Sequence, residues 1–98
     1  MNCVFEVADK TGRKIRLTKR QWRETTLKHP GMTVYLEEIK ETLVKPDVIT
    51  DYSIDEKVRY YHKYFKHIKS WNTYLLVIVK YLNSNGFVTK SYFESKIK

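Results

Sequence analysis

The stretch Tyr74–Leu82 (YLLVIVKYL), followed by Asn83–Gly86 (NSNG) and Phe87–Phe93 (FVTKSYF), decides the fold class of this chain. The first part is the most apolar run of the sequence, and it is rich in the β-branched and aromatic residues that favour strands. The Asn- and Gly-rich tetrapeptide is a strong signal for a hairpin turn. We therefore predict two antiparallel strands, with residues 74–82 as the central strand of a sheet.

Shorter strand signals lie on the N-terminal side of this hairpin. Val48–Thr50 and Lys57–Phe65 show the period of strands. Cys3–Ala8 and Ile15–Leu17 flank the turn signal Asp9–Gly12, which predicts a short N-terminal hairpin.

Two helices are predicted between these strands. Thr18 begins a capping box, which predicts a helix at about Lys19–Lys28, and Pro30 with Gly31 ends it. A second apolar stripe predicts a helix at about Thr33–Val44 with an acidic outer face. The fold class is therefore α+β: a short N-terminal hairpin and two helices packed on an antiparallel sheet of about four strands. We expect residues 1–98 to form a single domain.

The basic charge is concentrated in the C-terminal part of the chain. The formal net charge is +8, and residues 57–98 hold nine Lys or Arg side chains, one acidic residue and ten of the fourteen aromatic residues. Aromatic rings can stack on bases while cations follow phosphates, so this pattern favours a nucleic-acid partner over a merely solvated basic surface. The single cysteine excludes a disulfide framework, and no stretch suits a signal peptide or a bilayer span. We expect a cytoplasmic protein without a membrane partner.

His29 is the first candidate for chemistry. It shares the predicted helix stripe of Trp22, Thr25 and Thr26, which places it on the side that faces the sheet. A histidine at a helix end is as often a capping group as a functional one, but imidazole is also the side chain best suited to proton transfer near neutral pH. Both interpretations remain open.

The strands supply further candidates. Lys80 interrupts the apolar strand and either reaches solvent or faces a cleft, while Thr89 and Ser91 share one face of the next strand. Arg59 and Tyr61 share one face of their strand with Lys63, and Tyr60, His62 and Tyr64 share the other face. Because the central strand is apolar on both sides, alternation does not decide which face is exposed.

Other site classes have little support. His62 and His67 are not spaced with further ligands for a metal site, so a packing or surface role is favoured. The sequence contains no glycine-rich phosphate loop, nucleophile elbow or pair of catalytic carboxylates. The outer glutamates of the second helix would repel DNA phosphates, which disfavours a helix-turn-helix repressor.

The order of several short motifs resembles a known family. These motifs are spread over nearly the whole chain: Gly12-Arg13-x-Ile15-Arg16-Leu17-Thr18, Trp22, His29-Pro30, Ile39–Leu43, Pro46-Asp47-Val48-Ile49, Tyr60-Tyr61, Leu76-Val77-x-Val79-Lys80 and Phe87-Val88-Thr89-x-Ser91-Tyr92. Together they resemble the small phage- and toxin-associated proteins of the barnase/EndoU/colicin/RelE-like nuclease group. The resemblance implies a metal-independent, toxin-like endoribonuclease that needs no cofactor and binds RNA across a sheet. In such an enzyme the ribose 2′-hydroxyl attacks the adjacent phosphorus.

The resemblance also implies roles for individual residues. His29 would transfer protons, Lys80 and Arg59 would stabilise phosphoryl charge, and Tyr61, Thr89 and Ser91 would position the RNA or assist proton transfer. The expected RNA-binding residues share a basic or aromatic side chain in the C-terminal part: Lys57, Lys63, Tyr64, Lys66, Lys90 and Tyr92. An acidic antitoxin or inhibitor protein is a possible partner. The alternatives are a non-catalytic RNA- or DNA-binding module and a protein-interaction domain whose basic face binds an acidic partner.

Overall fold

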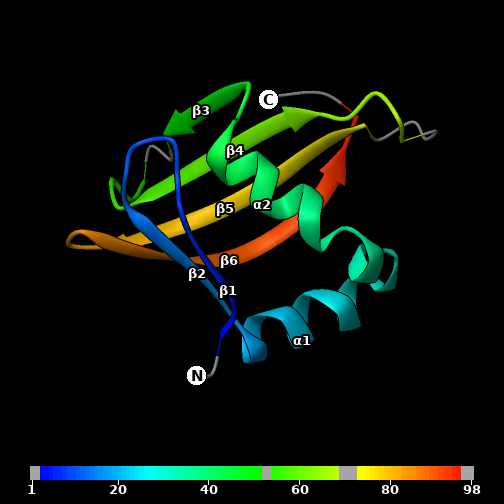
Figure 1. The fold of residues 1–98 in the computed structure, drawn as a ribbon, viewed down its shortest axis with the longest axis horizontal. Helices are drawn as coiled ribbons and strands as arrows, with labels where there is room; N and C mark the ends of the chain where they lie inside the picture. Colours follow the sequence, from blue (N-terminus) through cyan, green and yellow to red (C-terminus); the bar gives the residue numbers. More distant parts are fainter. Residues whose placement is uncertain (1–2, 52–53, 69–72, 96–98) are drawn as a thin grey trace.

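The computed structural model describes residues 3–51, 54–68 and 73–95, which form a six-stranded mixed sheet with helices packed against it (Figure 1). The strands lie in the order β1-β2-β6-β5-β4-β3. In chain order the elements are β1 (Cys3–Ala8), β2 (Lys14–Thr18), α1 (Lys19–Lys28), the 3₁₀ helix η1 (Pro30–Val34), α2 (Leu36–Val44), β3 (Val48–Asp51), β4 (Val58–Tyr64), β5 (Tyr74–Leu82) and β6 (Asn85–Glu94). No helix among these is long and apolar enough to cross a membrane.

The hairpin of β5 and β6 forms the middle of the sheet, as the sequence predicts. Its turn is shorter than predicted, because Leu82 already pairs with Asn85 and strand β6 begins there rather than at Phe87. Asn83 adopts the left-handed conformation with φ 61°, which asparagine tolerates better than most residues. A β-bulge between Ile78 and Val79 shifts the register further along the pair.

Strands β3 to β6 pair antiparallel as predicted, but the N-terminal hairpin extends the sheet, so the prediction of about four antiparallel strands is inexact: the sheet has six strands and is mixed. Strand β2 pairs with β6 in parallel, with Ile15 opposite Gly86. A Cβ atom at Gly86 would lie 2.9 Å from Ile15 Cδ1 and 3.1 Å from the Lys80 carbonyl oxygen. Glycine at position 86 therefore permits the close approach that joins the hairpin to the central strands.

The first helix has the predicted bounds, whereas the second is interrupted. The Thr18 hydroxyl caps α1 by accepting a hydrogen bond from the Gln21 N–H at 3.2 Å. The predicted helix Thr33–Val44 is divided into η1 and α2 at Tyr35, whose backbone leaves helical geometry. Residues i and i+3 lie in line along a 3₁₀ helix, and here this brings buried Met32 and half-buried Tyr35 to the same side.

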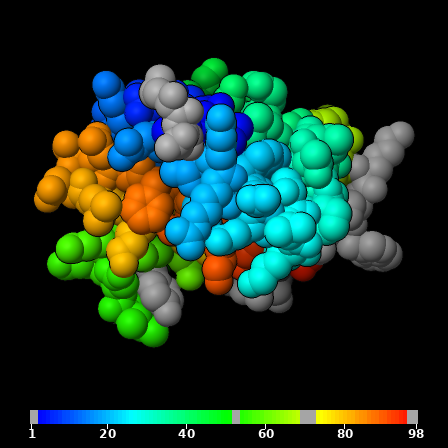
Figure 2. All heavy atoms as spheres, turned by 90° about the horizontal axis from the view of Figure 1, so that it is seen from below, coloured from blue at the N-terminus to red at the C-terminus, as the bar shows by residue number. Residues whose placement is uncertain are grey.

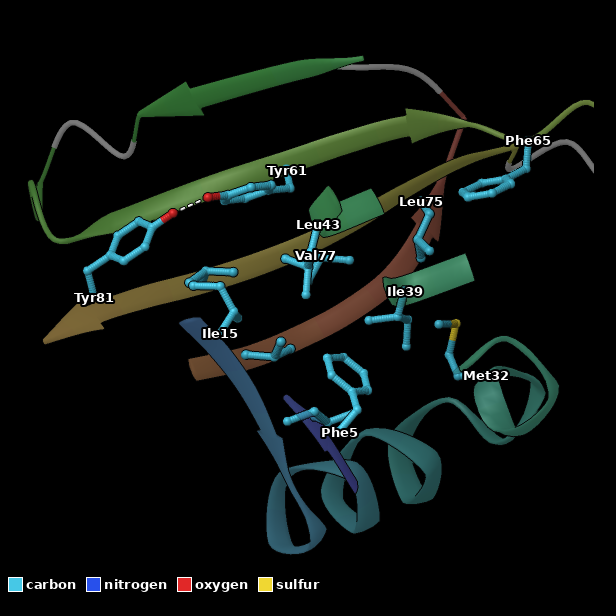
Figure 3. Packing of buried hydrophobic residues seen from close by; sticks show 13 residues of the cluster. Phe5, Ile15, Met32, Ile39, Leu43, Tyr61, Phe65, Leu75, Val77 and Tyr81 are labelled. Carbon is cyan, nitrogen blue, oxygen red and sulfur yellow. Dashed lines mark hydrogen bonds between the residues drawn. The ribbon is translucent and has the colours of Figure 1, made fainter. Parts of the chain in front are cut away.

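The two faces of the sheet are covered differently. Strands β4 and β5 pack under α2, where Ile39 and Leu43 meet Leu75 and Val77 in the hydrophobic core (Figure 3). Directly opposed residues of neighbouring strands point to the same face. Residues 60, 62 and 64 of β4 therefore share the face away from α2 with residues 76 and 78 of β5 and residues 90 and 92 of β6. We call this the open face; His62 and Leu76 on it are buried, whereas Tyr64 and Lys90 are exposed.

Candidate active site

A cleft of about 540 Å³ lies between α1 and the open face of the sheet. Helix α1 packs along β6, and Figure 2 shows the atoms of β6 in orange and red beside α1 in blue and cyan. The walls consist of one side of α1 and four positions of β6, with one residue each from β4 and β5: Gln21, Glu24, Thr25, Leu27, Lys28, His29, Tyr60, Ile78, Thr89, Lys90, Ser91 and Tyr92.

His29 lies at one end of this cleft, fixed by its own backbone. Its N–H donates to the Thr25 carbonyl at 2.8 Å and its carbonyl accepts from the Met32 N–H at 2.9 Å, so the residue joins α1 to η1. The imidazole is exposed and stacks on the ring of Tyr92, with centroids 5.5 Å apart and 25° between the planes. His29 is thus presented to solvent in a defined orientation.

Three of the predicted β6 residues join His29 in the cleft. Thr89 is the extra residue of the β-bulge, and its hydroxyl donates to the Ile78 carbonyl at 3.2 Å. Lys90 is exposed on the open face, opposite Ile78. Ser91 also lines the cleft, but it pairs with Val77, so its side chain points to the α2 side and is 1% exposed; its Oγ has no hydrogen-bond partner within the described part of the chain.

Tyr92 completes the predicted β6 residues. Burial raises the pKa of its phenol above the ordinary value, and the neighbouring Glu94 and Tyr60 add to this shift. The phenol therefore remains protonated at neutral pH and is able to donate a hydrogen bond.

Seven residues of the cleft were not predicted as site residues from the sequence: Gln21, Glu24, Thr25, Leu27, Lys28, Tyr60 and Ile78. Glu24 and Lys28 are exposed on α1, where Glu24 also lies 3.6 Å from Arg20 in an ion pair. Tyr60 is the residue of β4 that lines the cleft. The helical period places Glu24 and Lys28 one turn apart, but only the position of α1 along β6 shows that this side of the helix faces a cleft.

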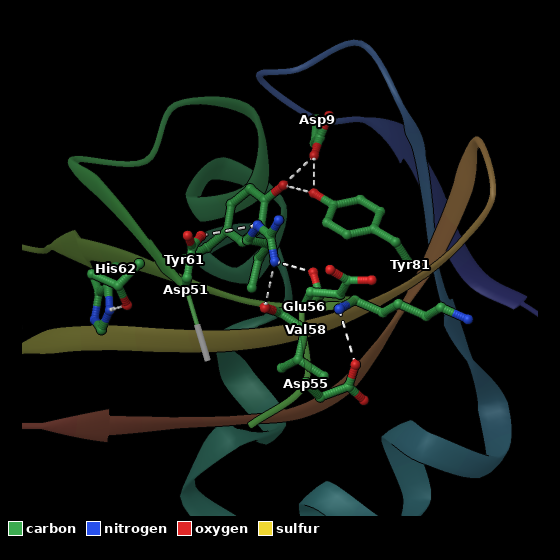
Figure 4. A network of polar contacts seen from close by, with 11 residues as sticks. Asp9, Asp51, Asp55, Glu56, Val58, Tyr61, His62 and Tyr81 are labelled. Atoms are coloured by element: carbon green, nitrogen blue, oxygen red, sulfur yellow. Dashed lines mark hydrogen bonds and ion pairs between the residues drawn. The ribbon is translucent and has the colours of Figure 1, made fainter. Parts of the chain in front are cut away.

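Tyr61 is not in the cleft, although the sequence made it a catalytic candidate. It is fully buried on the α2 side of the sheet, where its hydroxyl contacts the Asp9 carboxylate and the Tyr81 hydroxyl (Figure 4). The Tyr81 hydroxyl also donates to Asp9 at 2.8 Å. Burial, followed by these hydrogen bonds, raises the pKa of Tyr61 far above its ordinary value. Its hydroxyl is therefore enclosed by protein groups and lies away from the cleft.

Arg59 and Lys80 also lie outside the cleft, each held by a carboxylate. Arg59 Nε is 3.0 Å from Asp51 Oδ1, and its guanidinium donates to the Val58 carbonyl. Lys80 Nζ is 3.6 Å from Asp55 Oδ2, with its side chain 41% exposed (Figure 4). Lys80 shares the open face with Ile78, but its charge is already paired.

The predicted RNA-binding lysines of β4 and the following turn are also directed elsewhere. Lys63 Nζ donates to the Lys45 carbonyl at 2.8 Å and lies within 4 Å of Glu41 and Asp47, on the α2 side. Lys66 lines a separate hollow that it shares with three glutamates of α2. Lys57 is exposed just before β4 begins.

Two β4 side chains belong to the open face beyond the cleft. Tyr64 is 46% exposed, whereas His62 is 1% exposed. His62 Nε2 lies 3.0 Å from the Thr50 hydroxyl and Nδ1 lies 3.5 Å from Glu94. Burial lowers the pKa of His62, although Glu94 opposes the shift. The packing role predicted for His62 agrees with this burial.

No group of three or more His, Cys, Asp or Glu side chains with the arrangement of a metal site occurs among residues 3–51, 54–68 and 73–95. The cleft itself contains one carboxylate, Glu24. Its remaining polar groups are cations, hydroxyls, an amide and an imidazole, which suit binding of an anion and proton transfer better than metal ligation.

Comparison with known proteins gives a match to one family. No curated protein and no solved structure gives a significant match. The model of one family, described as phage-Barnase-EndoU-ColicinE5/D-RelE like nuclease2, matches residues 5–98 and so covers both α1 and the sheet that forms the cleft. The chain therefore belongs to this family of nuclease-like proteins.

Proposed function

We propose that the protein is an endoribonuclease that binds RNA across the open face of the sheet and cleaves it in the cleft beside α1. The single observation that carries the proposal is the placement of an exposed, stacked His29 in one cleft with Lys28 and Lys90. An imidazole beside two cations suits a phosphodiester, because the reaction needs both proton transfer and stabilisation of phosphoryl charge.

The proposed reaction is a transesterification within the RNA chain. The 2′-oxygen of one ribose forms a bond to the adjacent phosphorus while the bond from phosphorus to the 5′-oxygen of the next nucleotide breaks. The 2′-hydroxyl loses a proton and the leaving 5′-oxygen gains one. The products are a 2′,3′-cyclic phosphate and a 5′-hydroxyl, and no metal or other cofactor takes part.

The cleft residues divide this work between them. His29 supplies the imidazole of the cleft and Glu24 its carboxylate, and we assign the proton transfers to His29 with Glu24 as its counterpart. Lys28 and Lys90 stabilise the non-bridging phosphate oxygens. Thr89 and Tyr92 supply hydroxyls that orient the ribose and phosphate.

RNA on either side of the cleft would follow the open face. Tyr60 and Tyr92 are half-buried there, and Tyr64 and Lys80 extend the same face toward its ends. Rings that lie partly exposed on a sheet allow bases to stack without sequence preference. Such an enzyme acts where cytoplasmic RNA is accessible, and an acidic inhibitor protein that covers Lys28 and Lys90 would protect the host cell.

The decisive experiment incubates the purified protein with total RNA in EDTA and with single-stranded DNA of matched sequence. We expect cleavage of the RNA alone, and 2′,3′-cyclic phosphate ends identify the reaction. Binding without cleavage would instead support the non-catalytic binding module. Cleavage of DNA, which lacks the 2′-hydroxyl, would contradict the mechanism.

A further inference from the structure

A second hollow lies on the other side of the His29–Tyr92 stack. It also has a volume of about 540 Å³, and it shares Lys28, His29 and Tyr92 with the cleft. The two stacked rings therefore form a common wall between two adjacent spaces, with η1 and the end of β6 on the far side.

The second hollow differs from the cleft in chemistry. Met32, Tyr35, Ile68 and Phe93 line it, and none of its lining residues carries a carboxylate. Tyr35 and Phe93 pack edge to face with centroids 4.9 Å apart, which fixes both rings. The cleft, in contrast, presents Glu24 and several hydroxyls. The cleft therefore holds a carboxylate, whereas the second hollow presents the fixed rings of Tyr35 and Phe93.

These two spaces match the two sides of a phosphodiester. Any phosphate that reaches His29 carries one nucleoside on each side, and the second hollow is the space that adjoins the cleft at the His29–Tyr92 wall. We propose that the second hollow binds the nucleobase adjacent to the scissile phosphate, by contact with its apolar and aromatic lining. This proposal rests on the ribonuclease function proposed above. A volume of about 540 Å³ falls within the range of ligand-binding pockets, about 300–1,000 Å³.

The hollow also predicts the kind of specificity. Its one cation, Lys28, is available to the phosphate backbone, and its other lining side chains have few polar groups with which to read a base edge. Base stacking is tolerant of sequence because every base has a π-face. The subsite should therefore contribute affinity for any base.

Gly31 is a position at which a side chain can be added beside the hollow. It lines the space, and a Cβ atom added there would meet no atom within 4 Å. Gly31→Phe adds a ring at a position that lines the hollow, and Gly31→Ala is the matched control that changes the backbone freedom without adding a ring. Both variants are to be compared with wild type in melting temperature.

The test uses RNA oligonucleotides that are cleaved at one bond, either intact or with a single abasic residue on one side of that bond. For wild type, removing the base that occupies the hollow should raise KM on the order of tenfold, the effect of losing one stacked base. Gly31→Phe should raise KM for intact RNA by a similar factor with little change in kcat. On the abasic RNA, Gly31→Phe should cause no further increase in KM.

The alternative outcomes separate the two proposals. If wild type cleaves RNA but its KM is unchanged by an abasic residue on either side, the subsite is overturned while the ribonuclease remains, and this measurement does not depend on the folding of any variant. An equal effect of Gly31→Phe on intact and abasic RNA would also overturn the subsite. If wild type cleaves no RNA, the proposed function falls and the subsite falls with it.

Discussion

The His29 imidazole stacks on the Tyr92 ring with 5.5 Å between centroids and 25° between planes. The contact joins the end of α1 to β6 and fixes the orientation of a residue that its backbone bonds already hold in place. An oriented imidazole loses little conformational freedom when a substrate binds, which is the condition that general acid–base catalysis needs.

The first prediction concerns His29→Ala. If His29 transfers a proton in the slowest step, cleavage per folded molecule should fall by roughly a hundredfold or more, while RNA binding remains. Circular dichroism reports the folded fraction, and a single-turnover assay measures the cleavage. A variant that melts earlier but cleaves like wild type would show that His29 only stabilises the helix end.

A matched variant separates the stack from the proton transfer. Tyr92→Phe retains the ring on which His29 stacks and removes only the hydroxyl. We expect a smaller loss of cleavage than for His29→Ala, because the imidazole remains oriented. Tyr92→Ala removes the stack itself and should lower kcat further than Tyr92→Phe does.

The second prediction compares two pairs of lysines. Lys28 and Lys90 are exposed in the cleft, whereas Lys63 is held by Glu41 and Asp47. The double variant Lys28→Gln with Lys90→Gln should weaken RNA binding and make its salt dependence shallower by about 0.7 in slope for each lost phosphate contact. Fluorescence anisotropy over a range of salt concentrations measures this slope.

The control is the double variant Lys63→Gln with Lys66→Gln, which removes the same net charge. Lys63 is already paired, and Lys66 lies in a hollow with three glutamates, so neither should release a counterion from RNA. Equal slopes for the two double variants would mean that RNA binding depends on total charge and not on the cleft.

The secondary structure was largely predictable because its signals are local. The run Tyr74–Leu82 and the Thr18 cap each depend on neighbouring residues, and the structure confirms both. The parallel pairing of β2 with β6 was not predictable, because it depends on Gly86 meeting Ile15 across 71 positions of sequence. A glycine in a turn-like tetrapeptide carries no sign that another strand approaches it.

The candidate site was only partly predictable for a related reason. Alternation correctly placed Arg59, Tyr61 and Lys63 on one face of β4. The residues that form hydrogen bonds or ion pairs with these side chains, however, come from distant segments of the sequence. Asp9 binds the Tyr61 hydroxyl from the first turn of the chain, and Asp51 pairs with Arg59 from β3. Charge and aromatic content singled out residues 57–98 as the segment expected to bind RNA, but not which of its side chains are already paired.

The third prediction tests the buried role of Tyr61. Asp9 accepts hydrogen bonds from the hydroxyls of Tyr61, Tyr81 and Thr11 and from the Arg13 N–H. Burial raises the pKa of Asp9, but these bonds outweigh it and leave the pKa below its usual value. Tyr61→Phe removes one donor to a buried carboxylate and should cost about 1–3 kcal/mol of stability.

Catalysis by the folded Tyr61→Phe variant should equal that of wild type, because the hydroxyl lies on the α2 side of the sheet. Urea unfolding measures the first quantity and initial cleavage rates, corrected for folded fraction, measure the second. A large loss of activity without loss of stability would return Tyr61 to the catalytic residues. Tyr81→Phe removes the other phenolic donor to Asp9 and should behave in the same way.

The last prediction concerns pH and His62. Burial holds the pKa of His62 below its unfolded value of 6.5, with Glu94 as the opposing influence. A depressed pKa means that the unfolded chain binds the proton more readily, so the contribution to stability is complete above pH 6.5 and is lost as pH falls toward the lower folded-state pKa. The free energy of unfolding of wild type should therefore decrease between pH 7.5 and pH 5.5.

His62→Gln should lack that part of the decrease, whereas His67→Gln should retain it, because His67 is exposed. Urea unfolding at several pH values measures the difference, and parallel curves for wild type and His62→Gln would contradict the assignment.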